Sequence, residues 1–76
     1  MPDPKIPLDC KVMRGNSPRD SFQVTLDPED HAGLQDELER WLADHKWARE
    51  LWGGFRLDVR RTGEAKVIKT VRVRSG

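Results

Sequence analysis

The sequence of 76 residues predicts a single α+β domain of order ββαββ, with one helix packed on a four-stranded, mostly antiparallel sheet. Two observations support this prediction. Apolar and polar residues alternate with a period of two in four short segments, which is typical of half-buried strands, and a longer segment between the second and third has helical periodicity. A chain of this length buries about 60–65 % of its unfolded surface, which leaves room for one domain but little for a deep substrate pocket.

The first predicted hairpin runs from Leu8 to Leu26, within a domain that covers residues 8–76. Residues 1–7 are interpreted as a loose lead-in, because prolines at positions 2, 4 and 7 deny backbone donors. The residues expected to face inward are Leu8, Cys10 and Val12 in the first strand and Phe22, Val24 and Leu26 in the second. The segment Gly15-Asn16-Ser17-Pro18 supplies turn chemistry between the strands.

A helix is predicted to begin at Pro28, with Asp27 as its N-cap and acidic residues in its first turn. The inward face of this helix contains Leu34, Leu38, Trp41, Leu42, His45 and Trp52. Trp47 falls outside that face. Gly53-Gly54 is expected to end the helix, because glycine accepts the left-handed conformation common just after a helix.

The second predicted hairpin follows, with a first strand from Phe55, a turn at Thr62-Gly63-Glu64 and a last strand over Lys66–Arg74. Phe55, Leu57 and Val59 face inward in its first strand, and Val67, Val71 and Val73 share one parity in the last. Lys69 interrupts that parity, which a bulge or a rim position would accommodate. The order of elements over residues 8–74 resembles the β-grasp architecture of ubiquitin-like proteins and of the small immunoglobulin-binding domains of streptococci. This resemblance implies a fold and no function.

Charge is divided unevenly along the chain, although the net charge is only +1. Residues 27–53 carry eight acids against three basic residues, and residues 54–76 carry seven basic residues against two acids. By parity, the open sheet face presents Lys11, Arg56, Arg60, Lys66, Arg72 and Arg74 against Asp9 and Asp58. Such a face attracts phosphates or an acidic protein surface. The alternative is a solvated face whose charges resist aggregation.

The sequence predicts no catalytic, metal-ligating or cofactor-binding set. His31 and His45 would lie about 21 Å apart on one helix, too far to share a metal ion. Cys10 has the inward parity of a small buried hydrophobe, which denies it the access that a nucleophile needs. Asp9 and Asp58 lie on an arginine-rich face that favours ion pairing over acid–base chemistry. We therefore do not expect an enzyme.

Trp47 is the other candidate for partner binding, because large aromatic residues are enriched in binding hot spots. Two alternatives remain open: an exposed Trp47 marks an interface, whereas a bend after Asp44 would place it in the core. Phe22 and Phe55 both have inward parity and the chain lacks tyrosine, so bases are not expected to stack on the sheet.

These features predict a small non-catalytic protein–protein interaction module, such as an adaptor, an inhibitor or an accessory subunit, with a phage or mobile-element origin as one hypothesis. The alternative is a nucleic-acid-binding accessory protein that contacts phosphates with the basic face. The opposed charges also permit a homo-oligomer. No apolar run reaches the length of a membrane span and no signal-peptide pattern is visible, so we expect a cytoplasmic protein without membrane contact.

Overall fold

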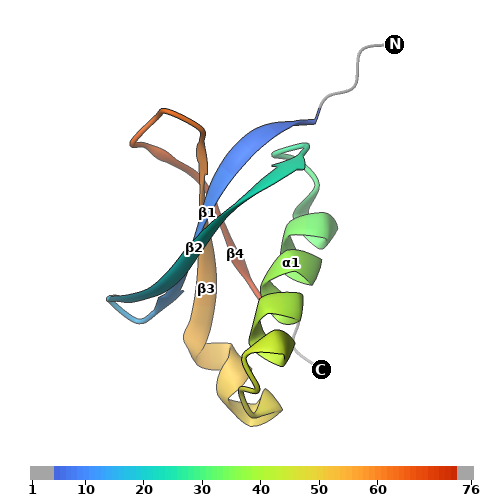
Figure 1. Ribbon diagram of the computed structural model, residues 1–76, viewed down its shortest axis with the longest axis vertical. Helices are drawn as coiled ribbons and strands as arrows, with labels where there is room; N and C mark the ends of the chain where they lie inside the picture. The colour runs from blue at the N-terminus through green and yellow to red at the C-terminus, as the bar shows by residue number, and fades with distance from the viewer. Residues whose placement is uncertain (1–4, 74–76) are drawn as a thin grey trace.

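The computed structural model describes residues 5–73 and shows a four-stranded sheet with one α-helix against one face (Figure 1). The strands are β1 (Ile6–Arg14), β2 (Ser17–Leu26), β3 (Phe55–Arg61) and β4 (Val67–Arg72). Helix α1 spans His31–Asp44, and a short 3-10 helix, η1, spans Arg49–Gly54. The predicted α+β class and ββαββ order are confirmed. The order across the sheet is β2-β1-β3-β4, and all three pairings are antiparallel.

The first hairpin begins earlier than predicted. Ile6 pairs with Leu26, so the last two residues of the expected lead-in belong to β1. Pro7 fits there because pairing with β3 begins only at Leu8, and the missing N–H therefore interrupts no bond of that ladder. The carbonyl of Pro7 also accepts a hydrogen bond from the amide of Thr62 at 3.4 Å.

The turn of this hairpin is shorter than predicted and consists of Gly15-Asn16 alone. Gly15 has a φ of 60°, as expected for glycine at the first central position of a type II′ turn. Ser17 and Pro18 belong to β2 rather than to the turn. Pro18 is tolerated because β2 is an edge strand, and the register shift beside it leaves Arg19 as an unpaired bulge residue.

Helix α1 begins three residues after the predicted start, because Asp30 and not Asp27 is its N-cap. The Asp30 carboxylate accepts a hydrogen bond from the amide of Gly33 at 3.0 Å. Asp27 accepts instead from the amide of Glu29 at 2.9 Å, in a turn that precedes the helix. A side chain at position 33 would collide with the Asp30 carboxylate, so glycine there permits the cap. Asp27 and Asp30 are both suitable N-cap residues, and the prediction of Asp27 was wrong.

Helix α1 ends at Asp44, well before the predicted glycine stop. Lys46 adopts a left-handed φ of 59°. The amide of Lys46 donates to the carbonyl of Ala43 and the amide of Trp47 to that of Leu42, both at 3.1 Å. This pair of bonds is a Schellman motif, which turns the chain back towards the helix it leaves.

The core lies between α1 and the sheet. Its buried residues are Leu8, Cys10, Val12, Leu34, Leu38, Leu42, Phe55, Leu57, Val59 and Val71. All three tryptophans are half-buried against this core, and the ring of Trp47 lies 4.9 Å from that of Phe55 between centroids. The bend after Asp44 therefore places Trp47 on the core, which is the second of the two alternatives. Gly53-Gly54 ends η1 instead of α1.

Strand β4 contains a bulge. Lys69 pairs with Val59 on the side of the helix, whereas the next pair along the ladder joins Val67 to Arg60. Ile68 is left between them and is 37 % exposed. Val67 consequently lies across from a residue of the open face, so its predicted inward position is wrong, while Lys69 is half-buried at the rim.

Candidate functional site: the open face of the sheet

The face of the sheet away from α1 carries alternating charges. The register of β1 and β3 places Asp9 opposite Arg60 and Lys11 opposite Asp58. Asp9 and Asp58 are therefore diagonal neighbours, each directly across from a cation. Within residues 5–73 no ion pair joins Asp9 to Arg60 or Lys11 to Asp58. The two carboxylates are not directly opposite each other, whereas acid–base chemistry would need a close like-charge pair.

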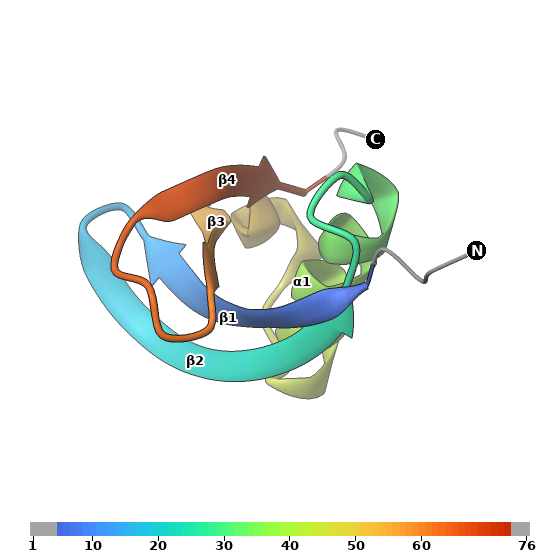
Figure 2. The ribbon, with the colours of Figure 1, turned by 90° about the horizontal axis from the view of Figure 1, so that it is seen from above.

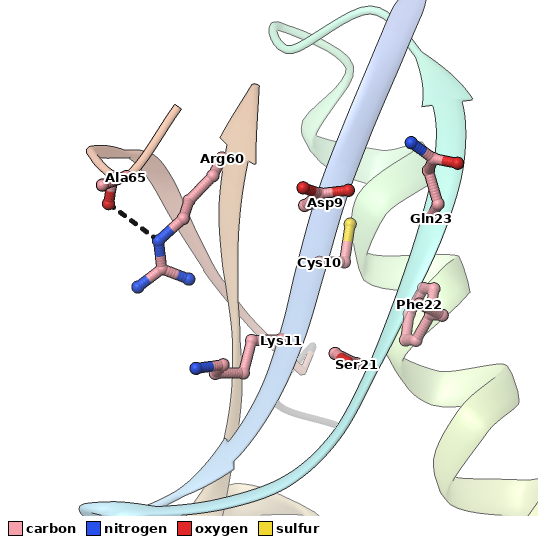
Figure 3. Close-up of a pocket in the computed structure, with 8 residues that line it drawn as sticks. All are labelled: Asp9, Cys10, Lys11, Ser21, Phe22, Gln23, Arg60 and Ala65. Carbon is pink, nitrogen blue, oxygen red and sulfur yellow. Dashed lines mark hydrogen bonds between the residues drawn. The ribbon is translucent and has the colours of Figure 1, made fainter. Parts of the chain in front are cut away.

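A hollow of about 690 Å³ opens on this face. Its lining consists of Asp9, Cys10 and Lys11 of β1, Ser21, Phe22 and Gln23 of β2, Arg60 of β3, and Ala65 of the β3–β4 loop (Figure 3). Figure 2 shows that the strands twist strongly and that the β3–β4 loop passes close to β1 and β2. Gln23 Nε2 donates to Thr62 Oγ1 at 2.9 Å, which ties this loop to the neighbouring hairpin.

Ser21, Gln23 and Ala65 were not among the predicted site residues. The outward parity of Ser21 and Gln23 on β2 places them on the same face as Lys11, and this signal could have identified them. Ala65 belongs to a loop whose position depends on long-range contacts, and no pattern in the sequence indicates it.

Arg56 is occupied by contacts within the protein. Its Nε lies 3.3 Å from Asp58 Oδ1, and its Nη1 donates to the carbonyl of Gly15 at 2.6 Å. Asp58 Oδ1 also accepts from Thr70 Oγ1 at 3.3 Å. Arg56 therefore braces the β1–β2 turn, and its charge is largely neutralised by Asp58.

Lys66 and Arg72, two further predicted cations, do not line the hollow. Lys66 is exposed in the loop before β4, so the predicted strand over Lys66–Arg74 is too long at its start. Arg72 is exposed opposite Arg56, a like-charge pairing that favours neither residue. Arg74 lies outside the described residues. Of the predicted cations that the structure describes, Lys11 and Arg60 alone line the hollow.

Lys11 and Arg60 retain donors that residues 5–73 do not use. Arg60 Nε donates to the carbonyl of Ala65 at 2.9 Å, while its Nη groups form no hydrogen bond or ion pair with residues 5–73. Lys11 is half-buried and forms no ion pair within the same range. In Figure 3 the two charged groups end on the same side of β1. The hollow thus contains two cations able to bind an anion.

Trp47 does not border this hollow. It packs on Phe55 beside η1, and the guanidinium of Arg14 lies 5.4 Å from the centre of its ring. The exposed large hydrophobic residues within the described range are Leu51 and Ile68, neither of which is aromatic. Phe22 lines the hollow but is half-buried against the core, so the described open face has no fully exposed aromatic ring on which a nucleic-acid base could stack.

A second polar cluster, which residue parity did not predict, lies at the edge of β2. Trp41 Nε1 donates to Asp20 Oδ2 at 2.8 Å, and the imidazole of His45 stacks on Trp41 with ring centroids 4.1 Å apart. The hydrogen bond from Trp41, followed by that from the amide of Ser21, lowers the pKa of Asp20 below its usual range. His45, which was predicted on the inward face of the helix, is exposed, with Nδ1 2.8 Å from the carbonyl of Trp41.

Cys10 lies beneath the hollow but is only 1 % exposed. Burial, assisted by the carboxylates of Glu37 and Asp9, raises the pKa of its thiol to about 11. The thiol is therefore protonated at neutral pH, whereas a nucleophile needs the thiolate. This result agrees with the prediction of a small buried hydrophobe.

Within residues 5–73, no cluster of three or more His, Cys, Asp or Glu side chains is arranged to hold a metal ion. None of the helices in that range combines the length and apolar character needed to cross a bilayer. Comparison of the chain with protein-family models, with curated proteins and with solved structures finds no match.

Proposed function

We propose that this chain is a small protein-binding module, acting as an adaptor, an inhibitor or an accessory subunit, that engages its partner with the open face of the sheet. The supporting observation is the pair of cations in the hollow, Lys11 and Arg60: Lys11 forms no ion pair within residues 5–73, and the Nη groups of Arg60 form no hydrogen bond or ion pair there. Side chains that retain unused charged donors are suited to recognising an anionic group on another molecule.

The proposed role is non-catalytic. Asp9, the carboxylate among the residues that line the hollow, is exposed and lies across from Arg60. The thiol of Cys10 beneath the hollow is protonated at neutral pH. These features support recognition, since catalysis by such groups depends on an accessible thiolate or on carboxyls with separated pKa values. We also propose a cytoplasmic location, which the single reduced cysteine supports.

Nucleic acid is the competing partner. It is supported by the positive surplus of the open face, where Lys11, Arg56, Arg60 and Arg72 stand against Asp9 and Asp58. A protein partner is favoured over it for two reasons. The two carboxylates repel a phosphate backbone, and the described part of this face has no exposed aromatic residue for base stacking.

The test is capture from a native lysate by the immobilised chain, with and without nuclease. The informative variant is Lys11→Glu/Arg60→Glu, and the matched control is Arg19→Glu/Arg61→Glu. The control changes the net charge equally, because Arg19 and Arg61 are exposed cations that do not line the hollow. Both variants are first checked for an unchanged thermal midpoint.

We expect the wild type and the control variant to retain the same proteins after nuclease treatment, and the Lys11/Arg60 variant to lose them. Retention of nucleic acid alone would favour the competing partner. Equal loss in both variants would show that net charge, and not this face, drives capture. If the immobilised chain captures only further copies of itself, and size-exclusion chromatography shows a mass above that of the monomer, the chain forms a homo-oligomer instead of binding a separate partner.

A further inference from the structure

The donors of Arg60 are held in a fixed direction. Its Nε is bonded to the carbonyl of Ala65, so the plane of the guanidinium is set by the β3–β4 loop. That loop is itself anchored, because Thr62 is bonded to Gln23 of β2 and to Pro7 of β1. A guanidinium with a fixed plane and free Nη groups is suited to the two oxygens of a carboxylate.

The carboxylates that face these two cations in the sheet are occupied elsewhere. Asp58, opposite Lys11, is contacted by Arg56 and by Thr70. Asp9, opposite Arg60, lies 3.5 Å from Thr62 Oγ1, while the Arg60 guanidinium turns towards its own loop. Diagonal neighbours on adjacent strands are roughly 7–8 Å apart, within reach of long side chains. Lys11 and Arg60 are such neighbours, and one anion can therefore contact both.

On each edge strand of the sheet, a side chain occupies a backbone group. The amide of Ser21 in edge strand β2 donates to Asp20 Oδ1 at 2.8 Å. The carbonyl of Arg72 in edge strand β4 accepts from Gln35 Nε2 at 3.0 Å. Side chains that occupy the backbone groups of an edge oppose the addition of a further strand.

From these contacts we infer that Lys11 and Arg60 form an anchoring site for a glutamate or aspartate side chain on an extended, acidic segment of the protein partner. The inference rests on the proposed function and specifies the chemistry of the same face. Ser21 and Gln23 lie beside the anchor and supply polar groups for the backbone of that segment. A hollow of about 690 Å³ is in the size range of small-ligand sites and accommodates a few residues.

The test uses a ten-residue peptide of alternating glutamate and serine as the probe, with its glutamine counterpart and a ten-nucleotide oligothymidylate for comparison. Binding is followed by calorimetry and by the NMR signals of the Arg60 Nε–H and the Lys11 side chain. We expect the glutamate peptide to shift both signals. Lys11→Gln and Arg60→Gln should each weaken its binding about tenfold, the usual scale for removing one charge-assisted bond.

Matched variants separate geometry from charge. Arg61→Gln removes a neighbouring exposed cation that does not line the hollow, and should change the dissociation constant less than about twofold. Arg60→Lys keeps the charge but removes the planar, bidentate guanidinium. It should therefore show most of the loss of affinity seen in Arg60→Gln. The inference is wrong if the glutamine peptide binds equally well, if Arg61→Gln weakens binding as much as Arg60→Gln, or if oligothymidylate binds more tightly than the glutamate peptide.

Failure of this inference and failure of the proposed function give different results. Protein capture from lysate that survives Lys11→Gln and Arg60→Gln would leave a protein-binding module with another anchor, and would overturn the inference alone. Glutamate-peptide binding without protein capture would support the anion site and overturn the proposed function.

Discussion

The two faces of the sheet are built from the same strands but differ in chemistry. The buried residues of the described chain, Cys10 among them, lie between α1 and the face that it covers, and none of them is polar or charged. The open face carries charged side chains that are exposed or half-buried, held by hydrogen bonds and, within residues 5–73, by one ion pair, Arg56 to Asp58. Neighbouring residues of one strand therefore serve different purposes, because successive side chains point to opposite faces.

This difference predicts that stability and binding can be changed separately. Full burial of a leucine contributes about 1.5–3 kcal/mol to the free energy of unfolding. A solvent-exposed ion pair contributes about 0–1 kcal/mol. Substitutions on the covered face should therefore destabilise the fold, and those on the open face should alter recognition at nearly constant stability.

The largest effect is expected for Leu57→Ala, which removes a fully buried side chain from β3. The free energy of unfolding should fall by about 2–5 kcal/mol, through lost burial and the cavity left behind. Lys11→Gln, on the open face of the adjacent strand, should change it by no more than about 0.5 kcal/mol. Urea denaturation of both variants measures the contrast, and similar losses in the two would contradict the division between the faces.

The buried thiol on the covered face predicts a loss of stability in alkali. Because the pKa of Cys10 rises from 9.0 to about 11 on folding, the unfolded chain releases this proton first as the pH increases. The stabilisation is complete below pH 9, and about 2–3 kcal/mol of it is lost by pH 11. In a reducing buffer, the free energy of unfolding of the wild type should fall by this amount between pH 9 and pH 11, whereas that of Cys10→Ala should not. An identical fall in both proteins would assign it to other titrating groups.

Trp47→Ala tests whether the tryptophan belongs to the covered side or to a binding surface. Trp47 packs on Phe55 and is half-buried, so its removal should cost about 1–3 kcal/mol, less than for a fully buried tryptophan. Capture of the partner should persist under conditions where the variant is folded. Leu51→Ala, at a residue 42 % exposed, is the control with little expected change. Lost capture with unchanged stability would extend the binding surface to this end of the molecule.

Sequence pattern predicted the two faces because alternation depends only on neighbouring residues. The inward parity of Leu8, Cys10 and Val12 is confirmed, as is the position of α1 over the sheet. The bulge that moves Val67 towards the open face was not located, because it depends on how β4 pairs with β3. Strand order across the sheet likewise depends on long-range contacts.

The candidate site was predicted only in part. Lys11 and Arg60 were two of six cations that parity assigned to the open face, but nothing in the sequence separated them from Arg56. The separation arises from partners distant in the chain: Gly15 and Asp58 occupy Arg56, whereas Lys11 has no such partner within residues 5–73. Register and side-chain direction decide these contacts, and parity determines neither.

The C-terminal end of α1 was predicted wrongly for a different reason. A substitution there has the smallest expected effect on stability. The left-handed position that usually indicates a helix end is occupied here by Lys46, with φ of 59°, while the glycines that suggested the end lie in η1. An L-residue with a side chain is strained in that conformation, which glycine adopts freely. Lys46→Gly should therefore raise the free energy of unfolding by about 0.5–1 kcal/mol.

Lys46→Ala is the control for this substitution, because it removes the same charge but keeps the Cβ atom that causes the strain. Thermal and urea denaturation should place the glycine variant above the wild type and the alanine variant close to it. Binding by the open face should be unchanged in both, since Lys46 does not line the hollow. Equal stabilisation by alanine and glycine would attribute the effect to the lost charge and not to the left-handed backbone at position 46.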